Sequence, residues 1–444
     1  YSLTADSARP KTDNILVCAV VTDFWIMDMI FYSLHLQAKG KEVTILINKA
    51  VFGKNFFLLH IIKKLKGIIK IHFYNSNLKV KTSKNFNIDE AKKAIINNIC
   101  YKEKIENYDQ IADDYNVLYE YFYNEYISTY LIMEKLLTSN KIQKVIVPSG
   151  FVYESASIYN YCKEAKINVI TAETYGFKTA KRMLGYNEMA VKDFSALKNI
   201  TINNRIEKYI ANHIKFQEKP IKQLEKKTGH LAYQTTTCDK IPDNIKGIIE
   251  NGKLNILIAT TVTGDSSTIG VSSPFGEQST WIKEVISFLS KIECNVFVRI
   301  HPIEKITKPK FQLHKCLDNH INEIGIENVC IIKPENPFNT FTLVKHVKFI
   351  LTWVSTISAD FVLRDKIVLL AAQAPFYKLG FCHYEKTKKK YFKKLNWLLN
   401  NNDKVCINQE VKNRAKLYIY FLFKNRVYTI DHSPGINPYD NFSL

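Results

Sequence analysis

The stretch Asn295-Val-Phe-Val-Arg-Ile-His301-Pro302-Ile-Glu304 is a largely apolar run that ends in an imidazole and a proline. A run without regular polar alternation is typical of a parallel strand covered by helices on both faces. Pro302 cannot donate to a strand ladder, so the strand must end beside His301. The stretch therefore predicts an imidazole at the carboxyl end of a buried parallel strand, the edge at which open α/β sheets bind their ligands.

Short runs of the same kind recur along the chain and alternate with helical patterns, which indicates the α/β class. Five lie in the first half, at residues 15–21, 42–47, 68–73, 144–147 and 168–171. Five more lie in the second half, at residues 254–260, 295–300, 329–332, 347–351 and 367–370. The most apolar stretch, residues 15–36, includes Asp23 and Asp28, which would be costly in a bilayer, so it predicts strand, loop and helix.

The chain has 444 residues, about three times the roughly 150 residues typical of one domain. Strand signals fade between residues 198 and 252, which marks a domain boundary. We expect two doubly wound, Rossmann-like domains that face each other across a cleft. The expected divisions are residues 1–245, with a helical insertion at about 88–140, then residues 246–410, and a helical tail at 411–444 that could pack back on the first domain.

The composition, 46% hydrophobic and 23% charged, excludes a disordered, collagen-like or coiled-coil chain. A formal charge of +20 favours anionic partners such as nucleotides, acidic glycans or anionic membrane surfaces. Lysines and arginines do not cluster with aromatics on a nucleic-acid-binding module, so we expect no nucleic-acid partner. The nine cysteines form no Cys-x-x-Cys pair, which indicates a reducing, cytoplasmic setting and gives no zinc signature.

Two further segments place small polar residues at expected strand ends. Residues 260–270 follow one strand and include Thr261, Gly264 and Asp265, in a pattern that matches neither dinucleotide nor P-loop fingerprints. Residues 349–358 end another strand in Ser355 and Thr356, either of which could cap the helix expected at 359–363. Hydroxyls and free N–H groups at such a turn suit a phosphate, which favours a nucleotide ligand on this domain.

These segments together resemble the C-terminal half of bacterial capsule and surface-polysaccharide glycosyltransferases of GT-B architecture. The His-Pro and Ser-Thr elements are similar to those of Kdo and sialic-acid transferases, and the resemblance covers residues 254 to 375 best. It implies that His301, Ser355 and Thr356 contact the phosphate of a CMP-sugar. The expected donor-binding set is His301, Pro302, Arg299, Glu304, Ser355, Thr356, Thr261, Gly264 and Asp265.

Sugar transfer needs a carboxylate near the anomeric carbon, as a general base or as a nucleophile. Three acids follow strands of the first domain: Glu173, Asp23 and Glu154. Glu173 is the first choice, because Glu-x-x-Gly here resembles the family's strand-end Glu before the linker. Asp23 is the second, and each of the three could instead cap a following helix.

The sequence contains no Asp-x-Asp triplet, so we expect metal-independent transfer without a cofactor. The acceptor would be a capsule or lipopolysaccharide glycan or its lipid-linked primer, reached from the inner face of the bacterial membrane. UDP-sugar transfer, UDP-sugar epimerisation and CDP-polyol transfer remain alternatives within the same fold. A basic nucleic-acid-binding protein or a catalytically silent scaffold are alternatives of a different class.

Overall fold

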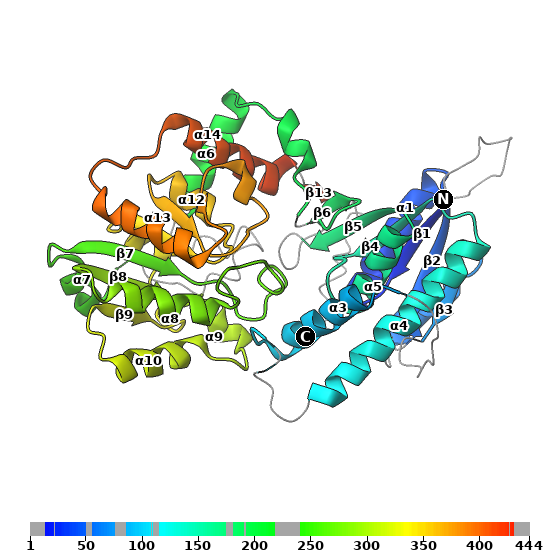
Figure 1. Cartoon of the computed structure of the whole chain (residues 1–444). Helices are drawn as coiled ribbons and strands as arrows, with labels where there is room; N and C mark the ends of the chain where they lie inside the picture. The colour runs from blue at the N-terminus through cyan, green and yellow to red at the C-terminus, as the bar shows by residue number, and fades with distance from the viewer. Residues whose placement is uncertain are drawn as a thin grey trace.

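The computed structural model describes residues 14–21, 23–49, 56–75, 86–107, 109, 115–174, 181–190, 192–217, 240–425 and 427–429. These residues form two α/β halves, each built around its own sheet (Figure 1). The predicted fold class is therefore confirmed: two Rossmann-like domains make up the molecule.

The N-terminal sheet has the order β13-β6-β5-β4-β1-β2-β3. Strands β1 to β5 are parallel, whereas β6 and β13 add antiparallel at one edge. The strands are β1 (Asn14–Ala19), β2 (Glu42–Asn48), β3 (Lys70–Tyr74), β4 (Lys144–Pro148), β5 (Asn168–Thr174), β6 (Lys181–Tyr186) and β13 (Val427–Thr429).

Alternate residues of the N-terminal strands pack into two separate cores, as expected for a sheet covered on both faces. On β1, Val17 faces α1 and α2, while Leu16 faces α3, α4 and α5. The helices are α1 (Asp23–Ala38), α2 (Phe56–Leu65), α3 (Ile88–Glu103), α4 (Tyr115–Ser139) and α5 (Tyr153–Glu164). The helical insertion expected at about 88–140 is thus a pair, α3 and α4, that covers one face of the sheet.

The C-terminal sheet is wholly parallel in the order β12-β11-β10-β7-β8-β9, the doubly wound arrangement with its switch point between β7 and β10. Its strands are β7 (Leu254–Ala259), β8 (Cys294–Arg299), β9 (Val329–Ile332), β10 (Phe349–Thr352), β11 (Ile367–Leu370) and β12 (His383–Tyr384). Its helices are α7 (Asp243–Ile249), α8 (Gln278–Leu289), α9 (Glu304–Thr307), α10 (Leu313–Ile324), α11 (Thr340–Val344), α12 (Ser358–Val362) and α13 (Lys388–Asn400).

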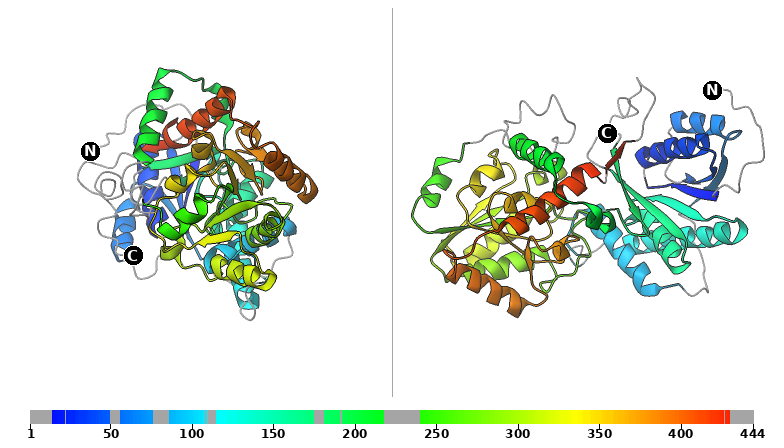
Figure 2. Two further views of the ribbon diagram at one scale, coloured as in Figure 1. Left: turned by 90° about the vertical axis from the view of Figure 1, so that its left-hand side faces the viewer. Right: turned by 90° about the horizontal axis from the view of Figure 1, so that it is seen from above.

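Two segments connect the halves at their boundary. The helix α6 (Asn204–Gln217) places Ile206 and Ile210 in the core of the C-terminal half, as α7 does with Ile245. That core therefore includes helices that precede residue 246. After α14 (Gln409–Tyr420), the chain returns to the N-terminal half, where β13 pairs antiparallel with β6 (Figure 2).

Within the described residues, no helix is both long enough and apolar enough to cross a bilayer. The stretch at residues 15–36 forms β1 and α1, as its two aspartates led us to expect.

Candidate functional site at the carboxyl edge of the C-terminal sheet

Three of the predicted segments meet at one edge, because β10, β7 and β8 are neighbours in the C-terminal sheet. The loop after β7 contacts the loop after β8 directly: the His301 N–H donates to Thr260 Oγ1 over 2.9 Å. On the other side, Thr352 Oγ1 at the end of β10 donates to the Ala259 carbonyl over 2.8 Å. Residues far apart in sequence thus form one continuous polar rim.

His301 is half-buried at the centre of this rim. Burial lowers the pKa of His301 to about 4; Asp265 acts in the opposite direction, and Arg299 adds to the lowering. At neutral pH the imidazole is therefore uncharged. Its Nδ1 accepts the Ile303 N–H over 3.2 Å, so the ring proton lies on Nε2. His301 can present a neutral N–H donor to a ligand oxygen.

Arg299 lies beneath the rim rather than on it. Its side chain is buried, and the two terminal nitrogens donate to the backbone carbonyls of Lys333 and Asn336 over 2.7 and 3.0 Å. Its guanidinium lies 5.5 Å from the Phe338 ring. These contacts hold the end of β8 against the segment after β9. Arg299 was expected among the residues that bind the donor, but its terminal nitrogens are used in these internal hydrogen bonds.

Glu304 and Thr261 also make internal contacts that shape the loops. Glu304 is buried, and its Oε1 accepts the Thr263 N–H over 2.9 Å; burial raises its pKa to about 7. The N–H and hydroxyl of Thr261 both donate to Gln278 Oε1 over 2.8 Å. Half-buried Pro302 leads from His301 into α9, at whose start Glu304 stands. These residues hold the loop after β7 in place around His301.

Gly264 is where the N-terminal half approaches this loop. Its φ is +66°, and a Cβ there would come within 2.6 Å of the Lys104 Cα. The Lys104 ammonium donates to the Gly264 carbonyl over 3.3 Å and lies 3.8 Å from the Tyr101 ring centre. Asp265 accepts the N–H and hydroxyl of Ser267 over 2.8 and 2.6 Å, which forms a tight turn next to Gly264.

The expected helix cap at Ser355 or Thr356 is wrong. The helix α12 begins at Ser358, its N-cap is Ile357, and no side chain caps it. The Ser355 carbonyl instead accepts the N–H and hydroxyl of Ser358 over 3.1 and 2.6 Å. The helix starts within one residue of the expected position, Ala359, but Ser355 and Thr356 do not cap it because a turn at residues 356–357 separates them from its first residue. Thr356 is exposed at this turn and faces the cavity described next.

A cavity of about 550 Å³ lies between the two halves. The N-terminal half contributes Phe151, Met183 and Lys192, from the β4–α5 loop, β6 and the segment that follows it. The C-terminal half contributes small and hydroxyl-bearing residues, with an aromatic wall from α14 and its neighbours: Ser266, Ser267, Gly270, Ser272, Thr356, Gln373, Phe376, Tyr377, Tyr418 and Phe423. The cavity thus opens at the carboxyl ends of both sheets, where the sequence predicted a cleft.

Of the three acids proposed for catalysis, Glu173 lies nearest to these loops. It stands on β5 opposite Met183, which lines the cavity, and it is half-buried. Burial is the main cause that raises the pKa of Tyr101, and the negative charges of Asp265 and Glu173 raise it further. Acids from the two halves therefore act on one tyrosine at the domain contact.

The other two acids lie elsewhere. Glu154 is buried in the N-terminal half and accepts a hydrogen bond from the Asn48 amide. Burial raises the pKa of the nearby Glu125, and the charge of Glu154 raises it further. Neither Glu154 nor Glu173 is among the residues that line the cavity, but Glu173 pairs with Met183, which does. Asp23 begins α1, and its side chain lies outside the described residues.

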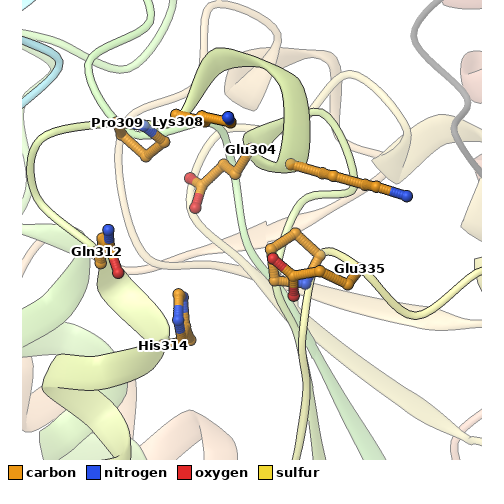
Figure 3. Close-up of a pocket in the computed structure, with 8 residues that line it drawn as sticks. Glu304, Lys308, Pro309, Gln312, His314 and Glu335 are labelled. Atoms are coloured by element: carbon orange, nitrogen blue, oxygen red, sulfur yellow. The ribbon is translucent and has the colours of Figure 1, made fainter.

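A second cavity, of about 270 Å³, lies beside α9 and the loop that follows it (Figure 3). Glu304 and Glu335 approach it from the loops after β8 and β9, and His314 approaches it from the start of α10. Two carboxylates and an imidazole around one small space can accept hydrogen bonds from the hydroxyls of a polyol such as a ribose. Glu335 was not predicted, because Lys333-Pro334-Glu335 matches no motif that points to a ligand.

The contact of Glu106 with α8 was also not predicted from the sequence. The Ser279 N–H and hydroxyl donate to the Glu106 carboxylate, the former over 3.2 Å. The pKa of Glu106 is raised to about 7, mainly by burial. The hydrogen bonds from Ser279 lower this pKa, and the negative charges of Glu277 and Glu304 raise it. Among the described residues, no group of three or more His, Cys, Asp or Glu side chains is placed to hold a metal ion.

The strand order and the cavity at the carboxyl ends of both sheets define a two-domain protein of GT-B-like architecture. No protein-family model matches the chain, and no curated protein matches its sequence.

Solved structures with a similar overall arrangement include KpsC from Thermosulfurimonas dismutans, a beta Kdo 2,4 transferase, at 12% identity and a TM-score of 0.38 over 62% of this chain and 79% of that one. The UDP-GlcNAc 2-epimerase from Neisseria meningitidis is 12% identical, with a TM-score of 0.28, over 93% of this chain and 100% of that one. Staphylococcus aureus MnaA in complex with UDP is also 12% identical, with a TM-score of 0.31, over 93% and 95%. Likeness this low carries no argument about activity, and the fold class rests on the strand order itself.

Proposed function

We propose that the protein is a glycosyltransferase that moves a sugar from a nucleotide-activated donor to a bacterial surface glycan. The expected donor is a CMP-sugar of the Kdo or sialic-acid type, held by the C-terminal half. The acceptor would enter from the N-terminal half, as a capsule or lipopolysaccharide chain or its lipid-linked primer.

The observation that carries this proposal is the cavity between the halves, whose lining comes from the carboxyl edges of both sheets. Open α/β sheets bind ligands at that edge, and two such edges facing one space suit a reaction between two substrates. Hydroxyls from Ser266, Ser267 and Thr356 line the space on the donor side.

The chemistry follows from the groups around it. In the transfer, the acceptor hydroxyl oxygen bonds to the anomeric carbon while the bond from that carbon to the donor phosphate oxygen breaks. The hydroxyl proton passes to Glu173 as general base, and the electron pair stays on the departing phosphate. The Nε2–H of neutral His301 stabilises the phosphate by hydrogen bonding, and the Lys104 ammonium at the domain contact adds positive charge. A retaining enzyme would use Glu173 as the nucleophile instead.

A thermal-shift series with CMP, CDP, UMP and UDP tests the donor. Stabilisation by CMP above the other nucleotides supports the CMP-sugar, because a ligand that binds only the folded state raises its stability. Stronger stabilisation by UDP would indicate a UDP-sugar transferase or epimerase in place of a CMP-sugar transferase. Stronger stabilisation by CDP would indicate a CDP-polyol transferase. No response to any nucleotide would overturn the proposal, and RNA binding that CMP does not affect would favour the nucleic-acid alternative.

The catalytic acid is tested by comparing Glu173→Gln with Glu154→Gln and Asp23→Asn. Loss of a general base lowers turnover by about 10²–10⁴-fold. We expect this loss in Glu173→Gln alone, with donor binding retained. Wild-type turnover in that variant would remove Glu173 from the site.

A further inference from the structure

The helix α13 has one face fixed to the protein core. Tyr391, Leu395, Leu398 and Leu399 are buried on this face, and Trp281 Nε1 donates to the Tyr391 hydroxyl over 3.0 Å. At its start, the Thr387 side chain accepts the Lys390 N–H over 3.3 Å and caps the helix. The helix is therefore a rigid support, and its opposite face is held in a defined position.

The opposite face is basic and carries a large aromatic side chain. Lys389, Lys390 and Lys393 are exposed, and Trp397 is 49% exposed on the same side. The Lys394 ammonium lies 4.4 Å from the centre of the Trp397 ring. Residues 386–402 contain no aspartate or glutamate, so no acid on the helix itself offsets these charges.

Some lysines elsewhere on the described surface are paired with carboxylates, in contrast to the lysines of this face. Lys310 lies 3.3 Å from Glu103, Lys412 lies 2.7 Å from Asp365, and Lys388, on the flank of α13, lies 2.6 Å from Glu284. Across the part of the chain that the structure describes, no carboxylate lies within ion-pair distance of Lys389, Lys390 or Lys393. The charges on this face are left for an external partner.

We propose that this face of α13, made of Lys389, Lys390, Lys393, Lys394 and Trp397, docks on an anionic lipid surface. Each lysine close to an anionic bilayer raises affinity roughly fivefold, and an indole prefers the interface between headgroups and acyl chains. A single convex helix face with one tryptophan among flexible lysines fits a bilayer, which presents no fixed shape to match.

A nucleic acid fits this face less well. The segment 386–402 contains no arginine, the side chain that recognises phosphates in bidentate fashion, and it exposes one indole rather than a row of rings for base stacking. The helix lies on the outer side of the C-terminal half, away from the N-terminal half (Figure 1). A bilayer there would leave the cavity between the halves open.

Trp397 provides a direct readout of docking. The other three tryptophans, Trp25, Trp281 and Trp353, are at most 8% exposed. The experiment mixes the full chain with vesicles of phosphatidylcholine alone, or with about 30 mol% phosphatidylglycerol, which supplies the anionic surface. We expect co-sedimentation with the anionic vesicles, a blue shift of tryptophan emission and protection from acrylamide quenching, and none of these with phosphatidylcholine alone.

The triple variant Lys389→Gln, Lys390→Gln and Lys393→Gln should weaken partitioning onto anionic vesicles on the order of 100-fold. A matched control replaces three exposed lysines of the N-terminal half with glutamine, at Lys63, Lys64 and Lys66. Its partitioning onto anionic vesicles should weaken far less. Trp397→Phe should abolish the blue shift while keeping most of the binding.

Three outcomes would overturn the proposal: no binding to anionic vesicles, equal loss in both triple variants, or binding without any change in Trp397 emission. Binding to a mixed-sequence RNA that is tighter than to the vesicles and lost in the α13 triple variant would assign the face to nucleic acid instead. None of these measurements depends on sugar transfer.

Discussion

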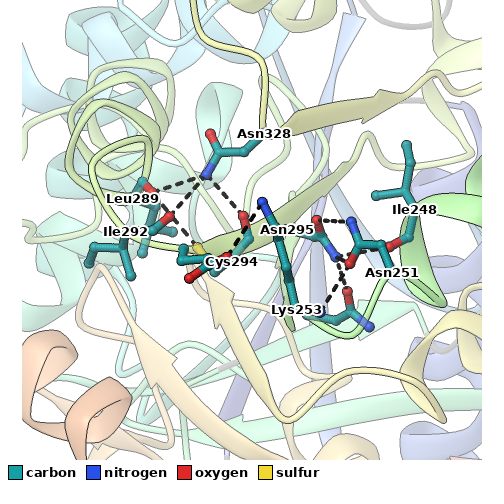
Figure 4. Close-up of polar contacts among 10 residues, drawn as sticks. Ile248, Asn251, Lys253, Leu289, Ile292, Cys294, Asn295 and Asn328 are labelled. Carbon is teal, nitrogen blue, oxygen red and sulfur yellow. Dashed lines mark hydrogen bonds and ion pairs between the residues drawn. The ribbon is translucent and has the colours of Figure 1, made fainter.

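The two edges of the C-terminal sheet use similar polar residues in opposite ways. At the amino edge, Asn295 donates to the Ile248 carbonyl, to Asn251 Oδ1 and to Asn255 Oδ1 over 2.9, 2.9 and 2.7 Å (Figure 4). Asn328 donates to the carbonyls of Leu289 and Cys294 over 3.1 and 3.0 Å. At the carboxyl edge, Thr356 and Glu304 line cavities instead, and His301 lies half-buried just before Glu304 in the chain.

This difference shows how one sheet separates stability from chemistry. Asn295 and Asn255 at the amino edge are buried, and their hydrogen bonds satisfy backbone groups of the strands and turns around them. The carboxyl-edge loops use Thr261, Glu304 and Arg299 to fix their shape, and this holds the half-buried His301 at the end of β8. Substitutions at the two edges should therefore have different consequences.

The largest effect is expected at the carboxyl edge. His301→Ala removes a hydrogen-bond donor from the departing phosphate and should lower turnover by about 10²–10³-fold, with the free energy of unfolding within about 1 kcal/mol of wild type. The control is His346→Ala, an exposed histidine near the amino edge of the same sheet. Steady-state kinetics and urea unfolding measure both, and equal turnover in the two variants would contradict the role of His301.

The next effect is expected at the amino edge. Asn295→Ala removes the amide that donates to the Ile248 carbonyl and to Oδ1 of buried Asn255, so these two acceptors lose a partner. The free energy of unfolding should fall by about 2–3 kcal/mol, since each buried unpaired group costs about 1–3 kcal/mol. Turnover per folded molecule should stay at the wild-type level. A loss of turnover larger than the loss of stability would show that the edges are not independent.

A pair of glycines compares the two edges directly. Gly264 and Gly252 both have positive φ, +66° and +82°, but a Cβ meets the Lys104 backbone only at Gly264 and has nothing within 4 Å at Gly252. Both alanine variants suffer backbone strain, and Gly264→Ala should lose about 1–2 kcal/mol more because it also separates the halves. Urea unfolding measures the difference. Equal losses would mean that the contact with Lys104 contributes nothing.

The smallest effect concerns pH at the domain contact. The pKa of Glu106 is about 7 when folded, above its usual 4.5, so the folded state holds this proton more tightly. By linkage, Glu106 causes stability to fall as pH rises from about 4.5 to 7, and Glu304 acts in the same direction. Glu106→Gln should reduce this fall on the order of 1 kcal/mol between pH 5 and 7.5. Exposed Glu323→Gln is the control, and identical pH profiles for Glu106→Gln and wild type would contradict the assignment.

Much of the architecture could be predicted from the sequence. All ten predicted runs form strands, because a strand buried on both faces must be apolar over its whole length. The strands β6, β12 and β13 were missed. The first, Lys-Arg-Met-Leu-Gly-Tyr, mixes charge into the run, and the other two are only two and three residues long, so none has a clear apolar pattern.

The candidate site could be predicted only in part. The positions of His301 and Thr356 just after the ends of β8 and β10 could be predicted, because Pro302 stops strand pairing and the apolar run before Ser355 ends there. The contacts of Tyr101, Lys104 and Glu106 with the C-terminal half could not be predicted. These residues belong to an ordinary helical tract, and its left-handed turn at Lys104 leaves no signal in the sequence. The position of the helix start at Ser358 also depended on a local turn rather than on capping preference.

The sequence by itself determined which segments are strands and that an imidazole ends one of them, because burial and ladder geometry act on neighbouring residues. Only the tertiary structure decided that Arg299 braces the sheet, that the charges of Glu173 and Asp265 act on the same tyrosine, and that Trp397 is exposed while Trp281 is buried. The reason is physical: these outcomes depend on contacts between residues distant in the chain, and desolvation and hydrogen bonding are set by where such residues meet.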